Sequence, residues 1–249
     1  MKKKLIGILA ACTLGTVLLA GCGGKTTSAT AGKDAAAKSE AAAAEETGSQ
    51  KETAENGTEN EAGQVELTAE KSENAEAMQK QFDGDEFHHI EIEIANYGTI
   101  KLELDATQAP VTVENFMTLA KDGFYDGLTF HRIIDGFMIQ GGDPNGNGTG
   151  GSGKNIKGEF AANGVENKIP HKEGVISMAR ATQPDSASCQ FFIMVEDYQS
   201  LDGQYAAFGW VTEGQNIVDQ IAKDAKPTDN NGSIRREEQP VITKITVID

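Results

Sequence analysis

The sequence predicts a mainly β domain, either an antiparallel barrel or a sandwich, in roughly the last two thirds of this 249-residue chain. Short runs in which apolar and polar residues alternate recur at close spacing after residue 86, as half-buried strands require. Turn-forming residues separate these runs, and only two stretches have helical periodicity. Every aromatic residue follows Gln81, so we expect the folded core to lie beyond the first third of the chain.

The predicted strands begin with a hairpin. Residues 90–94 and 100–104 each carry an isoleucine or leucine at every second position, and Asn96 and Gly98 suit the turn between them. Further strands are expected at 129–134, 137–140, 174–178, 190–195, 206–211 and 241–248.

Two helices are expected among these strands. Residues 110–121 place apolar side chains, Phe116 among them, on one face, and Pro110 suits the first turn of a helix. Residues 214–222 form a second, shorter amphipathic stretch with Ile221 facing inward. The whole folded region, 87–249, has the size of one ordinary domain.

The N-terminus has the features of an export signal. Three lysines follow Met1, and the apolar stretch 5–20 is shorter than the roughly 18 residues of a spanning helix. The box Leu19-Ala20-Gly21-Cys22 resembles the bacterial lipoprotein signal, in which the chain is cut before the cysteine and the thiol carries a lipid. We therefore expect a signal peptide at 1–21, a lipid such as palmitate on Cys22, and an extracytoplasmic protein anchored to a bacterial membrane. An ordinary cleavage site with a chance cysteine is the alternative.

Residues 22–86 are expected to form a lipid-anchored, disordered tether. The segment is rich in alanine and acidic residues, and Phe82 is its only aromatic residue. Such a composition cannot bury enough apolar surface to offset the entropy lost on ordering.

Composition excludes several classes of function. With 38 acidic against 22 basic residues and a formal net charge of −16, the chain is not expected to bind nucleic acid. The glycine-rich segment 141–158 lacks the spacing of a phosphate-binding loop. Cys189 has no disulfide partner once Cys12 is cleaved off and Cys22 is lipidated, so a packed thiol is expected. We expect no metal, no cofactor and a monomer.

The region 130–143 contains the side chains best suited to chemistry. Arg132 lies in an apolar block, and a buried, unpaired guanidinium is very costly. Strand alternation lets one face present this cation together with Gln140 and apolar side chains, and Gln190 and Phe192 repeat the pattern later. This group of residues contains no serine–histidine pair, paired carboxylates or cysteine–histidine pair, so nucleophilic and metal chemistry are unsupported.

Several segments, taken together, resemble the signature blocks of the cyclophilins in the family's order. They are Phe130-His131-Arg132-Ile133-Ile134, Gly136-Phe137-Met138-Ile139-Gln140-Gly141-Gly142-Asp143, Ile176-Ser177-Met178-Ala179, Ser188-Cys189-Gln190-Phe191-Phe192-Ile193 and Leu201-Asp202-Gly203. The similarity spans about residues 88–249. It implies an eight-stranded antiparallel β-barrel capped by two α-helices, and peptidyl-prolyl cis-trans isomerase activity without a cofactor.

The resemblance also implies roles for individual residues. Rotation about an X-Pro amide meets a barrier of about 18–20 kcal/mol, which a donor to the amide nitrogen and a grip on the proline ring would lower. Arg132 would be that donor, with Phe137 and Gln140 as the other catalytic residues. The substrate-binding residues would be Met138, Ala179, Gln190, Phe192, Leu201 and Tyr205. Without the resemblance, barrel core would be the preferred role for the apolar members.

The sequence departs from the family pattern at three positions. Ser200 stands where many eukaryotic cyclophilins have a tryptophan associated with cyclosporin binding, and Tyr205 replaces a usual histidine. Arg180 replaces a frequent asparagine, which puts peptide-backbone contacts there in doubt. Weak inhibition by cyclosporin is therefore expected.

Three functions remain in competition. The leading one is an isomerase acting on proline-containing exported polypeptides. The second is a cyclophilin-like peptide-binding module or holdase without significant catalysis. A solute-binding transport lipoprotein shares the lipid box but would be a larger, two-lobed α/β protein.

Overall fold

The computed structural model describes residues 57–59 and 65–249. The predicted signal peptide, Cys22 and most of the predicted tether lie outside the described residues. The elements are, in chain order, β1 (Gly57–Glu59), β2 (Val65–Leu67), α1 (Ala75–Gln81), β3 (Phe87–Ile94), β4 (Gly98–Asp105), α2 (Pro110–Lys121), β5 (Phe130–Ile134), β6 (Met138–Gly141), η1 (Ala161–Asn163), β7 (Val175–Met178), β8 (Phe191–Met194), η2 (Gln199–Leu201), β9 (Ala207–Glu213), α3 (Gln215–Asp224), η3 (Arg236–Glu238) and β10 (Ile242–Val247).

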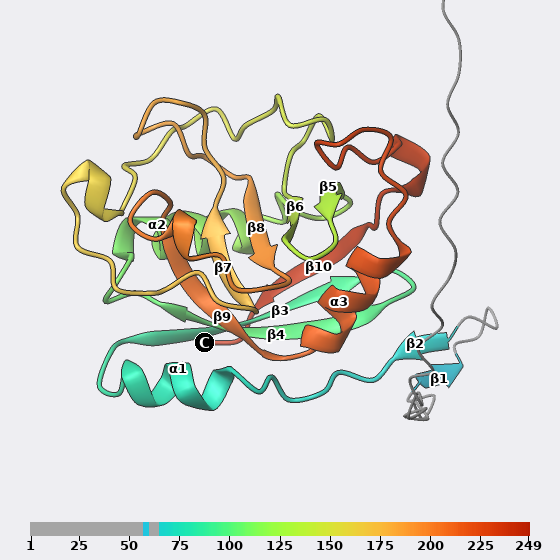
Figure 1. Ribbon diagram of the computed structural model, residues 1–249, viewed down its shortest axis with the longest axis horizontal. Coiled ribbons are helices and arrows are strands. Elements are labelled where there is room, and N and C mark those ends of the chain that lie inside the picture. Colours follow the sequence, from blue (N-terminus) through green and yellow to red (C-terminus); the bar gives the residue numbers. More distant parts are fainter. Residues whose placement is uncertain (1–56, 60–64) are drawn as a thin grey trace, which may run out of the picture. The chain divides into compact units, whose positions relative to one another are not determined.

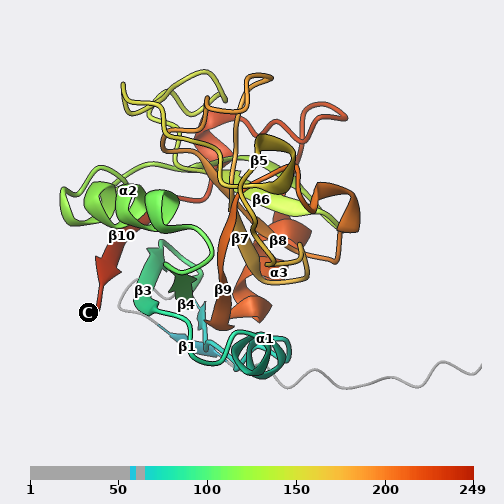
Figure 2. The ribbon, with the colours of Figure 1, turned by 90° about the vertical axis from the view of Figure 1, so that its left-hand side faces the viewer.

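Eight strands form one curled antiparallel sheet in the order β10-β3-β4-β9-β7-β8-β6-β5 (Figures 1 and 2). The two edges approach each other, because an isolated bridge joins Thr129 to Val241 and the Phe130 N–H donates to the Pro240 carbonyl at 3.0 Å. The predicted eight-stranded antiparallel fold is confirmed. Each predicted strand is present, and none of its ends is shifted by more than three residues.

Strand alternation fills the interior of the curled sheet. Ile90 pairs with Leu102 and Ile92 with Ile100 across β3 and β4, and each of these side chains is buried. The turn between the strands has Asn96 at a φ of 68°, a conformation that asparagine tolerates better than most residues. The local alternation that predicts the hairpin therefore also selects the side chains of the core.

The two predicted helices cover this core. Helix α2 occupies the predicted residues and packs against β10 and β4, while α3 packs against β4 and β6. Phe116 of α2 is fully buried, and its ring lies 5.4 Å from that of Phe191 and 5.3 Å from that of Phe208. Aromatic packing of this kind fixes α2 on the sheet.

Helix α1 is a third helix that the sequence did not predict. It lies within the segment predicted to be disordered, yet its Met78 and the following Phe82 are buried. The Phe82 ring stacks on Trp210 of β9 at a centroid distance of 5.8 Å. The predicted disorder is therefore wrong for residues 67–86, which we call the N-terminal strap. Its apolar partner lies on β9, so the composition of the segment alone could not reveal the packing.

Backbone hydrogen bonds fasten the N-terminal strap along the domain. The Leu67 N–H donates to the Tyr97 carbonyl at 3.0 Å, and the Ser72 N–H donates to the Thr212 carbonyl at 2.8 Å. A Cβ on Gly98 would lie 2.8 Å from the Leu67 carbonyl oxygen, so only glycine lets the strap cross here.

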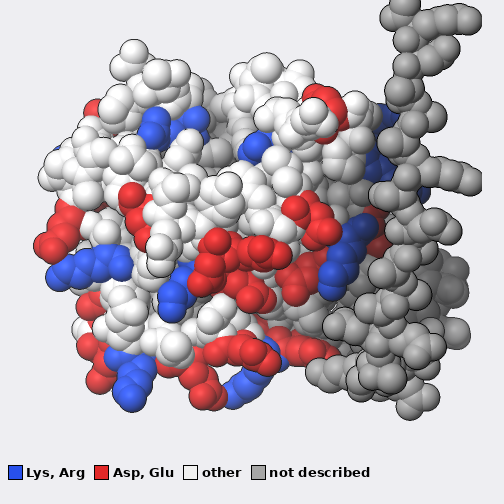
Figure 3. All heavy atoms as spheres, in the orientation of Figure 1, with Lys and Arg blue, Asp and Glu red and all other residues white. Residues whose placement is uncertain are grey.

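The surface of the domain carries many carboxylates. Figure 3 shows acidic side chains gathered across the middle of one face, with fewer basic ones around them. Burial raises the pKa of Glu173, and the nearby carboxylates of Asp219, Asp197, Glu73 and Glu196 raise it further. Repulsion among these groups therefore favours proton uptake as the solution is acidified.

None of the helices in the described part of the chain is long and apolar enough to cross a membrane.

Candidate active site

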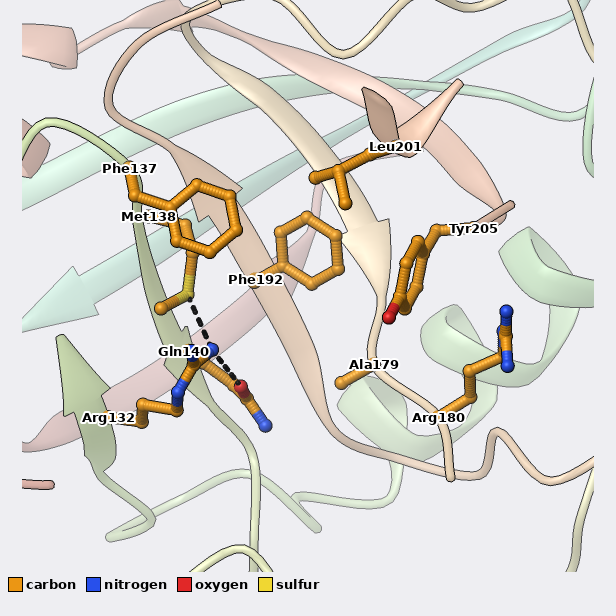
Figure 4. A pocket seen from close by; sticks show the side chains of 9 residues that line it. All are labelled: Arg132, Phe137, Met138, Gln140, Ala179, Arg180, Phe192, Leu201 and Tyr205. Carbon is orange, nitrogen blue, oxygen red and sulfur yellow. Dashed lines mark hydrogen bonds between the residues drawn. The ribbon is translucent and has the colours of Figure 1, made fainter. Parts of the chain in front are cut away.

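A cavity of about 260 Å³ opens on the face of the sheet opposite the main core. Residues of β5, β6 and β8 and of the segments after β7 and β8 line it (Figure 4). The lining residues are Arg132, Phe137, Met138, Gln140, Ala179, Arg180, Phe192, Leu201 and Tyr205. The structure thus brings together every predicted site residue except Gln190, which lines the adjoining cavity, and Cys22, which lies outside the described residues.

The period of two in the strands explains why these side chains share one face. Met138 and Gln140 point into the cavity, whereas Ile139 between them joins the main core. Phe192 likewise faces the cavity while its neighbour Phe191 is buried in the core. The cavity therefore lies on a second hydrophobic cluster, separate from the interior of the curled sheet.

Arg132 holds its guanidinium at the edge of the cavity through several contacts. Its Nε donates to the Asn231 carbonyl at 2.8 Å, and its Nη1 donates to Gln140 Oε1 at 3.2 Å. Nη1 also lies 3.6 Å from the Met138 sulfur, and the guanidinium carbon lies 5.9 Å from the centre of the Phe137 ring (Figure 4). Within residues 57–59 and 65–249, Nη2 has no hydrogen-bond partner. Its N–H groups are free to donate to a ligand.

The charge of Arg132 is retained although the side chain is half-buried. Burial lowers its pKa, while Tyr205 and the Asp229 carboxylate act in the opposite direction. Guanidinium groups do not lose their proton in proteins at neutral pH. Asp229 also accepts the N–H groups of Asn231 and Ser233, each at 3.0 Å. This turn positions the carbonyl that receives the Arg132 Nε–H.

A chain of amide hydrogen bonds links Arg132 to the glycine-rich segment. Gln140 accepts from Arg132 and donates from Nε2 to Gln190 Oε1 at 3.0 Å, and Gln190 Nε2 donates to the Gly150 carbonyl at 2.8 Å. Gln190 thus lines a second cavity of about 580 Å³, which shares Gln140, Ala179 and Arg180 with the first. The two cavities form a continuous groove that suits an extended peptide.

The floor and far wall of the first cavity are apolar. Met138 is 1% exposed and Phe192 is 5% exposed, so both present a fixed surface. The Tyr205 ring meets Phe192 edge to face at 5.8 Å, and Leu201 closes the cavity beside them. An apolar ring can therefore enter within reach of the Arg132 guanidinium.

Arg180 is a lining residue that sequence reasoning singled out only as a departure from the family pattern. Its guanidinium carbon lies 4.7 Å from the centre of the Tyr205 ring and 5.0 Å from that of Phe160. Its Nε and Nη2 donate to the Gln204 carbonyl at 3.1 and 2.9 Å. Arg180 therefore braces Tyr205 at the junction of the two cavities.

The family follows from comparison with known proteins. The family model described as cyclophilin type peptidyl-prolyl cis-trans isomerase/CLD matches residues 89–247. This chain belongs to that family. The match covers most of the cyclophilin domain predicted at 87–249.

Relatives and solved structures agree with this assignment. A peptidyl-prolyl cis-trans isomerase of Helicobacter pylori is 52% identical over 128 residues, which are 51% of this chain and 76% of the relative. Peptidyl-prolyl cis-trans isomerase B of Bacillus subtilis is 44% identical over 138 residues, 55% of this chain and 87% of the relative. A cyclophilin type isomerase of Cryptosporidium parvum has a TM-score of 0.58 at 29% identity, covering 66% of this chain and 99% of that one. A crystal structure of that protein in the presence of the dipeptide Ala-Pro has a TM-score of 0.57 at 30% identity and covers 65% and 99%.

A serine–histidine–aspartate arrangement, with the serine and histidine buried and the aspartate exposed, supports the cyclophilin pocket from behind. His171 Nδ1 lies 3.0 Å from Asp202 Oδ1, and His171 Nε2 lies 3.0 Å from Ser177 Oγ. This pair lies outside the group of residues around Arg132 that the sequence singled out, and a turn at residues 173–174 brings its two members together. Ser177 is 0% exposed and His171 1%, so no substrate reaches the hydroxyl. The imidazole instead stacks on Phe192 at 6.0 Å and fixes that wall of the pocket.

Acidification is expected to destabilise this support. Burial lowers the pKa of His171, and Asp202 offsets only part of that effect. In the unfolded chain the imidazole has the ordinary histidine pKa of about 6.5, whereas in the folded protein the same imidazole takes up a proton only at lower pH. Below about pH 6.5 the unfolded state therefore binds more protons than the folded state. The contribution of His171 to the free energy of unfolding is present above this pH and is lost progressively as the pH falls.

Urea unfolding between pH 7.5 and pH 5 measures this loss. His171→Gln, which keeps an amide able to reach Asp202 or Ser177, should show a smaller decrease in the free energy of unfolding than the wild type. Equal pH slopes for the two proteins would show that His171 does not contribute.

Cyclosporin is expected to inhibit this cyclophilin domain weakly. Ser200 is exposed in η2, so the tryptophan associated with drug binding has no counterpart there. The chain's single tryptophan, Trp210, is 1% exposed and packs under the N-terminal strap, and thus cannot substitute. Titration of the drug in a peptide isomerisation assay measures the inhibition constant, and a nanomolar value would contradict the expectation.

Proposed function

We propose that the smaller cavity catalyses cis-trans rotation about X-Pro bonds, with Arg132 as the hydrogen-bond donor to the twisted amide. The observation that carries this proposal is the half-buried guanidinium beside an apolar pocket, with Nη2 lacking a partner in the described part of the chain. An ion pair would be expected if the charge served only packing, since a desolvated charge otherwise costs several kcal/mol, roughly.

Rotation requires no bond to break and no proton to move. In the planar amide the proline nitrogen shares its lone pair with the carbonyl, which creates the barrier of about 18–20 kcal/mol. As the amide twists, the lone pair localises on nitrogen and becomes a hydrogen-bond acceptor. A donor fixed beforehand at this position binds the twisted state more strongly than the planar one, and so lowers the barrier.

The remaining pocket residues hold the substrate for this step. Met138, Phe192 and Leu201 would pack against the proline ring, and Phe137 would close its outer side. The Ala179 N–H already donates to the Gln190 carbonyl at 3.0 Å, which leaves the Ala179 carbonyl to accept a peptide N–H.

Gln140 has a double part in this proposal. Its Oε1 orients Arg132, while its Nε2 is engaged by Gln190, so it would link catalysis to the peptide groove. A peptide carbonyl that enters the groove and replaces Gln190 Oε1 would accept the hydrogen bond from Gln140 Nε2.

Exchange NMR of an Ala-Pro peptide tests the proposed function. Uncatalysed interconversion takes tens of seconds or longer, and catalytic amounts of protein should bring it into the range of the exchange experiment. A protein that shifts the peptide resonances without accelerating exchange would instead be the peptide-binding module or holdase.

We also propose that the enzyme acts on exported polypeptides from a lipid anchor at Cys22. The lysine-rich start, the short apolar stretch and the box ending in Cys22 support this localisation. A chain between anchor and enzyme would let one anchored molecule reach clients at varied distances from the membrane.

Mass spectrometry of membrane-extracted protein tests the anchor. The mature chain should begin at Cys22 and carry the added mass of acyl groups, and Cys22→Ser should abolish both the modification and membrane retention. Detection of an unmodified Cys22 in membrane-extracted protein would contradict this localisation.

A further inference from the structure

We propose that Tyr198 is a further substrate-contacting residue, which extends the proline pocket and selects an apolar or aromatic side chain near the proline. This inference rests on the proposed function of the pocket. Tyr198 lies just before η2, outside the residues that line the cavity itself.

The first observation is an exposed aromatic ring in contact with a pocket wall. Tyr198 is 45% exposed, and it is the only aromatic residue among the exposed large hydrophobic residues of the described chain. Its ring lies 4.6 Å from that of Phe137, tilted by 49°. Phe137 therefore has the cavity on one side and Tyr198 on another, so the apolar wall continues outward onto the surface.

The second observation is that the backbone holds Tyr198 in place. Its N–H donates to the His171 carbonyl at 2.7 Å, and its carbonyl accepts the Leu201 N–H at 3.1 Å. Asp202, at the end of η2, accepts the His171 N–H at 2.7 Å. The same residues that fix the Leu201 wall thus fix Tyr198, and little entropy is lost when a ligand packs on its ring.

The course of the groove shows which part of a peptide would meet Tyr198. Ala179 and Arg180 lie across the cavity from Phe137 (Figure 4), and beyond them opens the larger cavity. An extended peptide with its proline in the pocket and one flank in the larger cavity carries its other flank past Phe137. Successive residues are about 3.3 Å apart, so the first or second residue on that flank reaches Tyr198.

The chemistry around the ring defines the preferred side chain. An aromatic face favours apolar and aromatic groups. Glu196 and Asp197 precede Tyr198 and are exposed, so a glutamate in the substrate would meet like charge. We expect the preference on this flank to be phenylalanine or leucine first, alanine next and glutamate last.

A peptide series tests the assignment. Each peptide has an Ala-Pro core. One position, either the first or the second residue before or after this core, carries phenylalanine, leucine, alanine or glutamate. Tyr198→Ala should lower kcat/KM for the phenylalanine and leucine peptides by about three- to tenfold on one flank only, through KM rather than kcat. Peptides with alanine at that position should lose much less, and Tyr198→Phe, which keeps the ring, should restore the selectivity.

Val111→Ala is the matched control, because Val111 is 40% exposed on α2 and lines neither cavity of the groove. It should leave every peptide unchanged. An equal loss for all peptides with Tyr198→Ala, or no loss for any, would overturn the assignment. If the wild type binds peptides without accelerating exchange, the catalytic function fails, and the same comparison made with peptide dissociation constants still decides the role of Tyr198.

Discussion

Arg132→Ala is expected to lower kcat/KM for isomerisation of an Ala-Pro peptide by about 10²–10³-fold, the usual cost of removing one positioned donor. The alanine variant keeps the apolar pocket of Phe192 and Met138 but has nothing to donate to the twisted nitrogen. Exchange NMR on a peptide that the wild type accelerates measures the loss directly.

Two further variants make this result specific. Arg132→Lys keeps the charge but loses the planar fork that bonds Asn231 and Gln140 together, so an intermediate rate is expected. Arg235→Ala removes an exposed arginine that pairs with Glu238, and should retain the wild-type rate. If Arg132→Ala kept the full wild-type activity, this result would contradict the proposed role of the guanidinium.

Phe82→Ala is expected to destabilise the protein by about 3–5 kcal/mol, the usual cost of truncating a buried phenylalanine. Phe82 is 5% exposed and stacks on Trp210, and the backbone of the N-terminal strap has little freedom to collapse into the space. Urea unfolding followed by tryptophan fluorescence measures the loss. Because Trp210 is the only tryptophan, its emission also reports on the strap, and we expect a shift toward longer wavelength in the folded variant.

Gln81→Ala is the control for this prediction, since Gln81 is the exposed neighbour of Phe82 at the end of α1. It should change the free energy of unfolding by about 0.5 kcal/mol or less. If Phe82→Ala unfolds like this control and its emission does not move, the strap does not cover Trp210.

The local part of the fold could be predicted because its signals are local. Alternation with a period of two identifies β3 and β4 from a few neighbouring residues, and a short apolar run identifies β8. Helix α2 follows from its apolar face and Pro110. The grouping of Arg132 with Gln140 follows in the same way, because the two residues pair across one tight hairpin.

The remaining features depend on contacts between residues distant in sequence. Met78 and Phe82 are four residues apart, a helical spacing, but nothing near them in the sequence indicates Trp210 as their partner. The sequence indicates Arg180 only as a departure from the family pattern. Its contact with the Tyr205 ring depends on the chain returning to the same place 25 residues later, which no local pattern predicts. Composition therefore places the start of the folded domain too late in the chain.

An NMR titration that measures peptide affinity and exchange on the saturated protein tests the role of Arg132 most directly. If the guanidinium acts on the twisted amide, Arg132→Ala should bind the Ala-Pro peptide with a dissociation constant within about threefold of the wild type. Its exchange rate at saturation should nevertheless fall by about 10²-fold or more. Equal exchange rates for the two saturated proteins would contradict this mechanism.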